Sequence, residues 1–408
     1  MSGNGRGGYD FFSPEALVDP YPLYKRIREE DPVHYSEAGG FWILTRHRDV
    51  AAALRDTRLS ADRKALFTSQ LGNLDTSLIQ NFFKLMSGWM IEKDPPEHTQ
   101  LRKIASRGFT PRALESWRPI IQETTDRLLD EVQDRHAMDI VADLSCRLPA
   151  QTIAEIFGVP REDQAKLIDW ALDIATFWGA PGGERIEELA RKADNSSVAF
   201  VAYLREIIEE RRRRPGTDMI SLLAIAYEEQ GLSLEQLPAL CIMILNAGHV
   251  TSADMIPNGF NALLRHPEQF QKLKDNPGLV NSAVEEMMRF DTSVPCIFRI
   301  AKEDVSIGGK VIPTGGVVAL GLASANHDPE EFESPGTFDI TRSPNNHFGL
   351  GLGIHFCLGA ILARMEMTTC FSTVLRRMPK LRADPDKLAS VRRTSLAFKG
   401  FDSLPVTF

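Results

Sequence analysis

The sequence predicts a mainly α-helical protein with small β-sheets, and three observations support this fold class. Apolar residues recur at helical spacing over most of the 408 residues, most regularly between 113 and 212. The clearest strand signals, a hairpin over 305–312 with a Gly-Gly turn and a strand over 317–320, are short. The chain is also long enough to bury a large core, and length alone favours two domains or more.

The N-terminal part is predicted to combine short elements with an apolar connection. Residues 1–10 are rich in glycine and are expected to form a flexible tip. A helix is predicted over 20–30, a short strand over 41–45 and the start of another helix over 51–54. Residues 60–92 show little periodicity but carry many large apolar side chains. A long apolar connection of this kind often lines a binding site.

Helices are expected to dominate from residue 94 onward. Asp94–His98 has the prolines and the acid of a helix start. In the helix that follows, His98 and Arg102 are four residues apart and share one face. Residues 113–212 predict a stack of amphipathic helices, interrupted by a loop over 178–183.

A long helix is predicted over 233–265, opening with a capping box. Because it is apolar nearly all round, it should be buried. Asn246–Ser252 is a polar, small-residue interruption within it. Gly248 lowers helix stability by about 1 kcal/mol relative to alanine, and Thr251 can donate its hydroxyl to a carbonyl one turn back. Either a functional site or a packing accommodation explains this interruption.

The same helix contains Pro257, which is expected to kink it. Asn276-Pro277 then opens a helix that carries Glu286 and Arg289. These two residues are three apart, so they can form an ion pair on one face.

One decapeptide, Leu350–Gly359, ends a glycine-rich loop with a single cysteine. Cys357 comes just before a strong helix pattern over 360–367, where free backbone N–H groups favour a thiolate over a thiol. Glycines there remove side chains where a flat group would press against the backbone. A haem iron bound by thiolate needs this closeness. The alternative is a buried structural cysteine after a turn.

Composition excludes several classes of protein. The net charge of −8 gives no basic field for nucleic acid or an anionic membrane. The five cysteines are scattered and lack CxxC spacing, so neither a disulfide framework nor a zinc site is predicted and a reducing cytoplasm fits. The N-terminal residues have no apolar core of a signal peptide, and the apolar run over 237–245 is too short to span a bilayer. We therefore expect a soluble cytoplasmic protein without a membrane partner.

These segments together resemble a bacterial cytochrome P450 of the soluble class I type. The resemblance covers nearly the whole chain and implies one domain over 11–408, in place of the two domains that length favours. The matching residues stand in the family's order: the helix start at 94–98 with Arg102, Ala247, Gly248 and Thr251, Glu286 and Arg289, the segment 325–342, and Gly351, Gly353, His355, Cys357 and Gly359.

The resemblance implies a chemical role for each motif. Cys357 is expected to be the axial thiolate of haem b, and Glu286 and Arg289 a structural pair behind its loop. Thr251 is expected to hold the hydrogen-bond network around the bound oxygen and to help deliver protons, while Ala247 and Gly248 leave room for O2. The residues expected to bind the haem propionates are His98, Arg102, Arg299 and His355, whose charges a buried carboxylate requires.

The substrate pocket implied by the resemblance is apolar with few polar groups. Such a pocket excludes a highly charged substrate, but it does not indicate which apolar molecule binds. Asn246 is either a polar anchor for the substrate or the donor of a hydrogen bond within its helix. The candidate pocket residues are Trp89, Met243, Asn246, Val250, Val294, Ile297 and Phe398, with further candidates over 60–92 and 177–183.

Three positions depart from the family's pattern. Leu350 replaces the usual phenylalanine, which keeps an apolar shelter for the cysteine but changes its shape. His327 stands where arginine is common. Val250 replaces the usual acid before the threonine, and valine cannot carry a proton. Either Thr251 and waters suffice for proton delivery, or the natural reaction depends less on it.

The predicted function is oxidation of a mostly apolar small molecule by a haem-thiolate monooxygenase, with O2 and two electrons, in specialised metabolism. Electrons are expected from NAD(P)H through a reductase and a ferredoxin or flavodoxin, for which Lys103, Arg107 and Arg112 form a basic docking patch or an ordinary solvated surface. Two alternatives remain: a P450 that catalyses oxidative coupling, ring formation or a peroxide-driven reaction, and a haem-binding sensor or carrier without turnover.

Overall fold

The computed structural model describes residues 8–72, 74–179, 185–385, 387, 389–392 and 396–408. Contacts within the chain divide it into two units. Unit 1 comprises Met1–Arg63, Asn258–Cys357 and Ser390–Asp402, and unit 2 comprises Lys64–Pro257, Leu358–Ala389 and Ser403–Phe408. The expected flexible tip over 1–10 and the loop over 178–183 lie partly outside the described residues.

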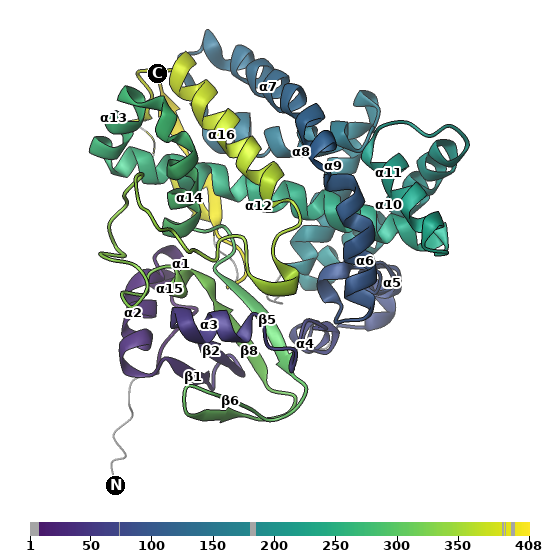
Figure 1. Ribbon diagram of the computed structural model, residues 1–408, viewed down its shortest axis with the longest axis horizontal. Helices are drawn as coiled ribbons and strands as arrows, with labels where there is room; N and C mark the ends of the chain where they lie inside the picture. The colour runs from purple at the N-terminus through teal and green to yellow at the C-terminus, as the bar shows by residue number, and fades with distance from the viewer. Residues whose placement is uncertain (1–7, 73, 180–184, 386, 388, 393–395) are drawn as a thin grey trace. The chain divides into compact units, whose positions relative to one another are not determined.

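Unit 1 is built on a five-stranded sheet with strand order β1-β2-β8-β5-β3 (Figure 1). β2 and β8 run parallel, with Ile43 opposite Ala319, and the other neighbours are antiparallel. The strands are β1 Val33–Ser36, β2 Phe41–Leu44, β3 Leu59–Ser60, β5 Cys296–Ala301 and β8 Val317–Gly321. A separate hairpin joins β6 Val305–Ile307 to β7 Lys310–Ile312 through Gly308 and Gly309 at φ 55° and 80°, the left-handed turn that the Gly-Gly pair predicts.

Short helices accompany this sheet. Apolar residues from β2, β8 and the neighbouring helices form its core, in which Leu44, Val318 and Leu320 are fully buried. The helices are α1 Pro14–Val18, α2 Tyr21–Glu30, α3 His47–Ala53, α13 Pro267–Asp275, α14 Val280–Phe290 and α15 Leu322–Ala325, with the 3-10 turns η6 Pro277–Leu279 and η7 Gly353–His355. A two-stranded ladder pairs β10 Ser390–Arg392 with β11 Gly400–Ser403.

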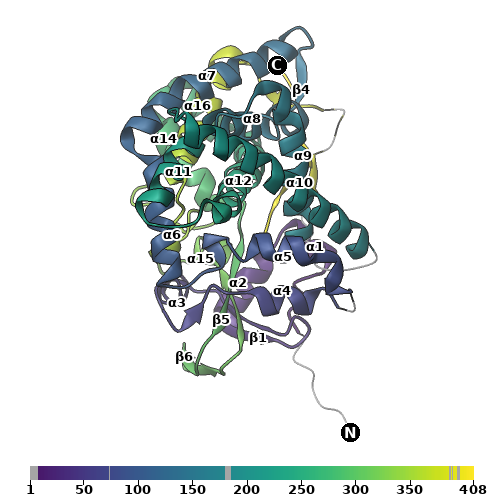
Figure 2. The same ribbon diagram turned by 90° about the vertical axis from the view of Figure 1, so that its right-hand side faces the viewer.

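Unit 2 is mainly helical (Figure 2). Its helices are α4 Lys64–Gln70, α5 Gln80–Met86, α6 Glu97–Ser106, α7 Pro111–Gln133, α8 Leu148–Ile156, α9 Arg161–Trp178, α10 Ile186–Arg213, α11 Met219–Glu229 and α16 Ala360–Arg377, with the turns η1 Thr76–Ile79, η2 Met90–Glu92 and η3 Arg107–Phe109 and the π-helical turn η4 Ile140–Ser145. A small sheet has the order β4-β12-β9, from Ala137–Asp139, Pro405–Thr407 and Arg382–Ala383.

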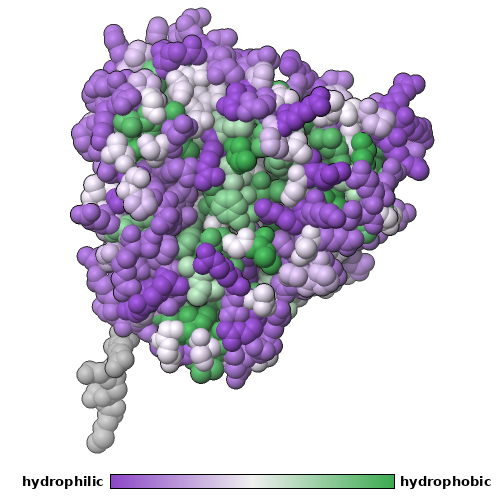
Figure 3. Space-filling view, in the orientation of Figure 1, coloured by the Kyte–Doolittle hydropathy of each residue, from purple (hydrophilic) through white to green (hydrophobic). Residues whose placement is uncertain are grey.

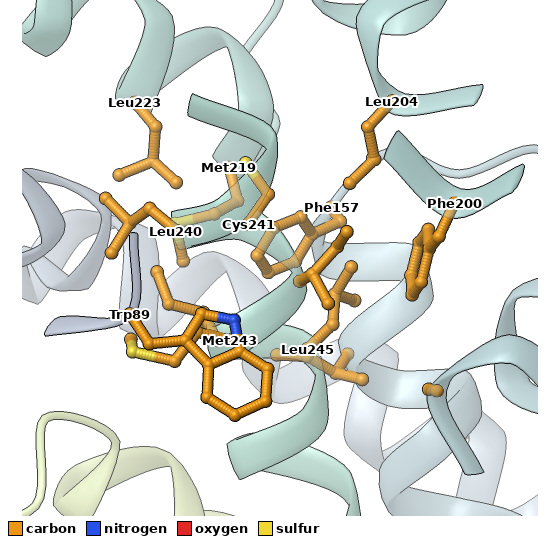
Figure 4. Close-up of a cluster of buried hydrophobic side chains, with 14 of the residues drawn as sticks. Trp89, Phe157, Phe200, Leu204, Met219, Leu223, Leu240, Cys241, Met243 and Leu245 are labelled. Carbon is orange, nitrogen blue, oxygen red and sulfur yellow. The ribbon is translucent and has the colours of Figure 1, made fainter. Parts of the chain in front are cut away.

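The predicted irregular connection over 60–92 is wrong, because the segment forms α4, η1, α5 and η2. These elements have seven residues or fewer, so each is too short for an apolar stripe of helical period to repeat in the sequence. Most of its apolar side chains belong to the core of unit 2, as does Phe177. Figure 4 shows part of this core, where Trp89 lies with Met243, Leu240 and Leu245.

The long predicted helix is α12, Leu237–Arg265, which starts in unit 2 and ends in unit 1. Ser233 caps the 3-10 turn η5 Leu234–Gln236 rather than α12 itself, and the helix continues through Pro257. By length and composition alone Leu234–Arg265 could cross a membrane, contrary to the expectation drawn from its short apolar run. However, 67% of its most apolar window is buried inside the fold, as in the core helix of a water-soluble protein.

The predicted fold class is confirmed: the chain is mainly helical with small sheets. The strands extend beyond the region near 305–320, since β1 to β5 precede it and β9 to β12 follow it. Except for β5, which has six residues, these strands have two to four residues, too few for an alternating pattern to be distinctive. Hydrophilic residues cover most of the face in Figure 3, with apolar residues in patches between them.

Candidate active site

The cysteine loop is held by its own backbone. The N–H of Gly351 donates to the carbonyl of Phe348 at 2.9 Å, and the N–H of Cys357 donates to the carbonyl of Leu350 at 2.9 Å. Cys357 is partly exposed and lies three residues before α16, whose first turn has no side-chain cap. The thiol is therefore accessible at a fixed position, and Leu350 contributes its backbone to this position whatever its side chain.

The loop glycines serve different purposes. A Cβ on Gly353, whose φ is 73°, would lie 2.6 Å from the carbonyl oxygen of Leu54, so this glycine lets the loop pack against the chain just after α3. The expectation that each glycine makes room for a flat group is therefore incomplete. A Cβ on Gly351, whose φ is 72°, would lie 3.7 Å from the carbonyl oxygen of His355, and one on Gly359 would lie 4.0 Å from the ring of Phe109. Both distances are ordinary van der Waals contacts, so a side chain at these positions would not clash with the described residues.

The ion pair of Glu286 and Arg289 lies behind the loop in unit 1. Both side chains are fully buried, and their two contacts measure 2.7 and 2.8 Å. Arg289 also donates to the carbonyls of Asn326, Pro335 and Thr337 at 2.8 to 3.0 Å. Glu286 accepts from the backbone N–H of Asp339 at 2.9 Å and from Arg342 and Asn345 at 3.1 to 3.3 Å.

This pair connects to the cysteine loop through Asn326. Arg289 binds the Asn326 carbonyl, and the Asn326 side chain accepts from the N–H of Phe348 at 2.7 Å. Phe348 in turn accepts from Gly351. The pair thus fixes the segment from Asn326 to Asn345 and the start of the loop.

His327 has a structural explanation in the same region. Its ring is buried, packs against Tyr21 at an angle of 42° with centroids 4.3 Å apart, and contacts the carbonyl of Ala323 at 3.1 Å. Burial first, and then the charge of Arg289, lowers its pKa to about 3. The ring is therefore neutral, whereas an arginine would add a buried charge beside Arg289.

The residues predicted to bind propionates belong to both units. In unit 2, His98 is buried on α6 and Arg102 is partly exposed one turn later. In unit 1, Arg299 on β5 is only 6% exposed and donates to the carbonyl of Phe298 at 2.9 Å, and His355 is partly exposed in η7. Arginine and histidine side chains are donors suited to carboxylates.

The interruption of α12 shows both a hydrogen bond and a close helix contact. The Thr251 hydroxyl donates to the carbonyl of Ala247 at 3.0 Å, as the sequence predicts. A Cβ on Gly248 would lie 3.3 Å from the side chain of Ile153 on α8, so Gly248 lets α12 approach α8 closely. Ala247 is exposed, and Val250 is partly exposed.

Sequence analysis missed two buried titratable groups near Thr251. His249 on α12 is 4% exposed and bonds the backbone at Cys146, and burial lowers its pKa to about 4. Glu366 on α16 is 1% exposed, and burial raises its pKa to about 8, with the nearby Ser252 hydroxyl opposing this shift. Neither Glu366 oxygen has a hydrogen bond of good geometry with any residue that the structure describes. The only signal for Glu366 in the sequence was its place among apolar residues of a predicted helix, which would have indicated a buried acid.

We expect Glu366→Gln to change how stability depends on pH. Between the unfolded pKa near 4.5 and the folded pKa near 8, the folded protein keeps a proton that the unfolded chain releases. The free energy of unfolding therefore falls with rising pH in this window, by about 1.4 kcal/mol per pH unit for one group, and is constant above it.

Glutamine cannot titrate, so the variant should lack this contribution. The measurement is urea unfolding of both proteins at pH 5.5, 6.5, 7.5 and 8.5. Their difference in unfolding free energy should shift in favour of the variant as the pH rises. Parallel profiles across this range would show that Glu366 is ionised in the folded protein.

The candidate substrate residues also fall in both units. Trp89 and Met243 are buried in one cluster in unit 2, where Trp89 meets Phe82 and Trp178 edge to face. The Asn246 amide is buried and has no hydrogen-bond partner among the described residues, so the internal helix bond, one of the two roles considered for Asn246, is absent there. Val294, Ile297 and Phe398, in unit 1, are partly exposed.

Comparisons with known proteins agree with these motifs. A family model described as Cytochrome P450 matches residues 74–387. The chain is 38% identical over 404 residues to the biotin biosynthesis cytochrome P450 of Bacillus subtilis, covering 97% of this chain and 98% of that one. It is 35% identical to the polyketide biosynthesis cytochrome P450 PksS of the same organism, covering 95% and 96%. A crystal structure of P450BioI, in complex with an acyl carrier protein ligated to hexadec-9Z-enoic acid, superposes with a TM-score of 0.88 at 36% identity, covering 97% of this chain and 100% of that chain.

Proposed function

The chain belongs to the cytochrome P450 family, and from this premise we propose that it hydroxylates or epoxidises a mostly apolar small molecule in specialised metabolism. The family is one of haem-dependent monooxygenases that receive electrons from a partner. The main structural support is Cys357, accessible at the end of a loop that the Glu286–Arg289 pair holds. We propose that residues 11–408 work as one domain in the cytoplasm.

The haem is haem b in this proposal, and when bound it supplies the activation of O2. Cys357 binds its iron as a thiolate. His98 and Arg102 from α6 would hold its propionates together with Arg299 and His355. The donor chemistry of these four side chains supports this assignment.

Thr251 is proposed to move protons in the site. Its hydroxyl oxygen is fixed by donation to the Ala247 carbonyl, so the same oxygen can accept a hydrogen bond from water. Val250 beside it cannot donate a proton. The native protein should therefore lose part of its electrons as hydrogen peroxide, or serve a reaction that needs less proton delivery.

We expect Val250→Glu to raise the ratio of oxidised product to hydrogen peroxide, because Val250 is partly exposed and an acid there can exchange protons with water. The measurement is product, peroxide and NAD(P)H consumption in one reconstituted assay. Val250→Gln is the matched control, with equal size and no acid. Tight coupling in the native protein with no gain from glutamate would exclude a special role for Val250.

The proposed electron donor is a ferredoxin or flavodoxin, supplied from NAD(P)H by its reductase. Lys103 and Arg107 lie one turn apart on one face of the α6–η3 segment, and Arg112 follows at the start of α7; all three are exposed. An acidic donor would be attracted to such a patch although the whole chain is negative.

Oxygen insertion can be distinguished from the alternative reactions by isotope. Products formed under 18O2 should carry one labelled oxygen, whereas coupling or ring formation gives unlabelled, dehydrogenated product. A sensor or carrier would bind ligands with a spectral shift but form no product with any donor. Substrates for this test come from a spectral binding screen, which should include fatty acids both free and linked to an acyl carrier protein, since P450BioI was solved with the linked form.

A further inference from the structure

A small pocket lies within unit 2 where α6 and α11 meet. Its volume is about 230 Å³, and it is lined by Lys103, Ile104, Arg107, Ala226, Glu229 and Gln230. Ile104 and Ala226 are buried, whereas the four polar residues are exposed. The pocket therefore has an apolar base and a rim with two cations and one anion.

One ion pair in this rim is formed by Arg107 and Glu229. Their side chains are 2.9 Å apart, and about 60% and 50% of them are exposed. Glu229 is the last residue of α11, where the negative end of the helix dipole disfavours an acid. Glu229 therefore does not stabilise its own helix. Its contact in the structure is with Arg107, whose positive charge it neutralises.

The turn that carries Arg107 also touches the chain just after the cysteine. A Cβ on Gly359 would lie 4.0 Å from the ring of Phe109, which belongs to the same turn, η3, as Arg107. Gly359 is two residues from Cys357, a distance of about 7 Å at most. A protein bound at this rim would thus be near the proposed thiolate.

We propose that Glu229 competes internally for Arg107, and that a surface carboxylate of an acidic electron donor displaces it and binds between Lys103 and Arg107. This inference rests on the proposed electron donor. Exposed ion pairs contribute little to stability, so one carboxylate can replace another easily. The donor must displace Glu229 before its carboxylate can pair with Arg107. It therefore binds more weakly and dissociates faster than it would from a protein without Glu229, and fast release suits repeated delivery of single electrons.

The experiment compares Glu229→Gln with Glu228→Gln in the haem-loaded protein. Both variants remove one negative charge, one residue apart, but Glu228 pairs with Arg212 on α10 at 3.0 Å. The probe is an acidic [2Fe–2S] ferredoxin, and the measurements are its dissociation constant and first-electron reduction rate at several salt concentrations. We expect Glu229→Gln to tighten binding about threefold at low salt, the scale of one exposed ion pair, and Glu228→Gln to have a much smaller effect.

A double-mutant cycle tests whether Glu229 acts through Arg107. In an Arg107→Gln background, Glu229→Gln should no longer tighten binding. Equal effects of the two glutamine variants, or an effect that persists without Arg107, would overturn the competition while leaving the donor assignment intact. A native protein that dithionite reduces but the acidic ferredoxin neither binds nor reduces would overturn the donor assignment, and this inference with it.

Discussion

Cys357→Ala is expected to abolish the thiolate-type Soret band of the reduced carbon monoxide complex and all turnover. The reason is chemical: alanine offers no ligand, and no neighbouring side chain of the loop can replace a thiolate that donates electrons to iron. The fold should persist, because the loop is held by backbone bonds from Gly351 and Cys357 that alanine preserves. The measurements are the absorption spectrum, the haem content and a thermal unfolding curve.

Cys146→Ala is the control for this variant. Cys146 is an exposed cysteine outside the loop, and its contact with His249 uses the backbone. It should keep the native spectrum and activity. If Cys357→Ala retained a thiolate-type band, another cysteine would have to be the ligand, and the proposed site would be wrong.

Glu286→Gln is expected to prevent stable folding or to leave a protein without haem. The change leaves the Arg289 guanidinium buried, with its charge uncompensated, and breaking a buried pair in this way costs about 3 to 5 kcal/mol. This is a large part of the roughly 5 to 15 kcal/mol that stabilises a typical protein. Glu286 also binds residues that precede the cysteine loop, among them Asp339 and Asn345, so their segment would lose its anchor.

Glu285→Gln provides a matched control on the same helix. Glu285 is partly exposed and contacts His347 at 3.2 Å, so its loss should change the free energy of unfolding by about 1 kcal/mol or less. Both variants are compared by urea unfolding and by the ratio of haem to protein. A Glu286→Gln protein with native stability and haem content would show that the pair does not hold the loop.

The sequence predicted those features that depend on a local pattern. The cysteine loop, the Glu286–Arg289 spacing and the Thr251 hydroxyl that bonds one turn back are determined by residues near one another in the chain, so the order of the amino acids is enough to indicate them. The hairpin at Gly308 and Gly309 was predicted for the same reason.

Features that depend on distant packing could not be predicted. Glu366 looks like an ordinary helix residue, and only its complete burial makes it an acid that stays protonated near neutral pH. Residues 60–92 are apolar both because they pack in a core and because they flank a proposed pocket, and composition does not separate these causes. Arg107 has the sequence pattern of a free surface charge, and its pairing with Glu229 depends on the packing of α11 beside it.

The division of unit 1 into three stretches of chain has a consequence for biosynthesis. β2 pairs in parallel with β8, more than 270 residues later, so the first 63 residues leave the ribosome long before their sheet partner exists. During this interval their strands present open edges and apolar side chains that favour aggregation. Cys357, the proposed haem ligand, closes the second of the three stretches, so under this proposal haem capture is a late event in synthesis. Slower translation of the middle of the chain should therefore lower the yield of haem-loaded protein more than it lowers the total yield of polypeptide.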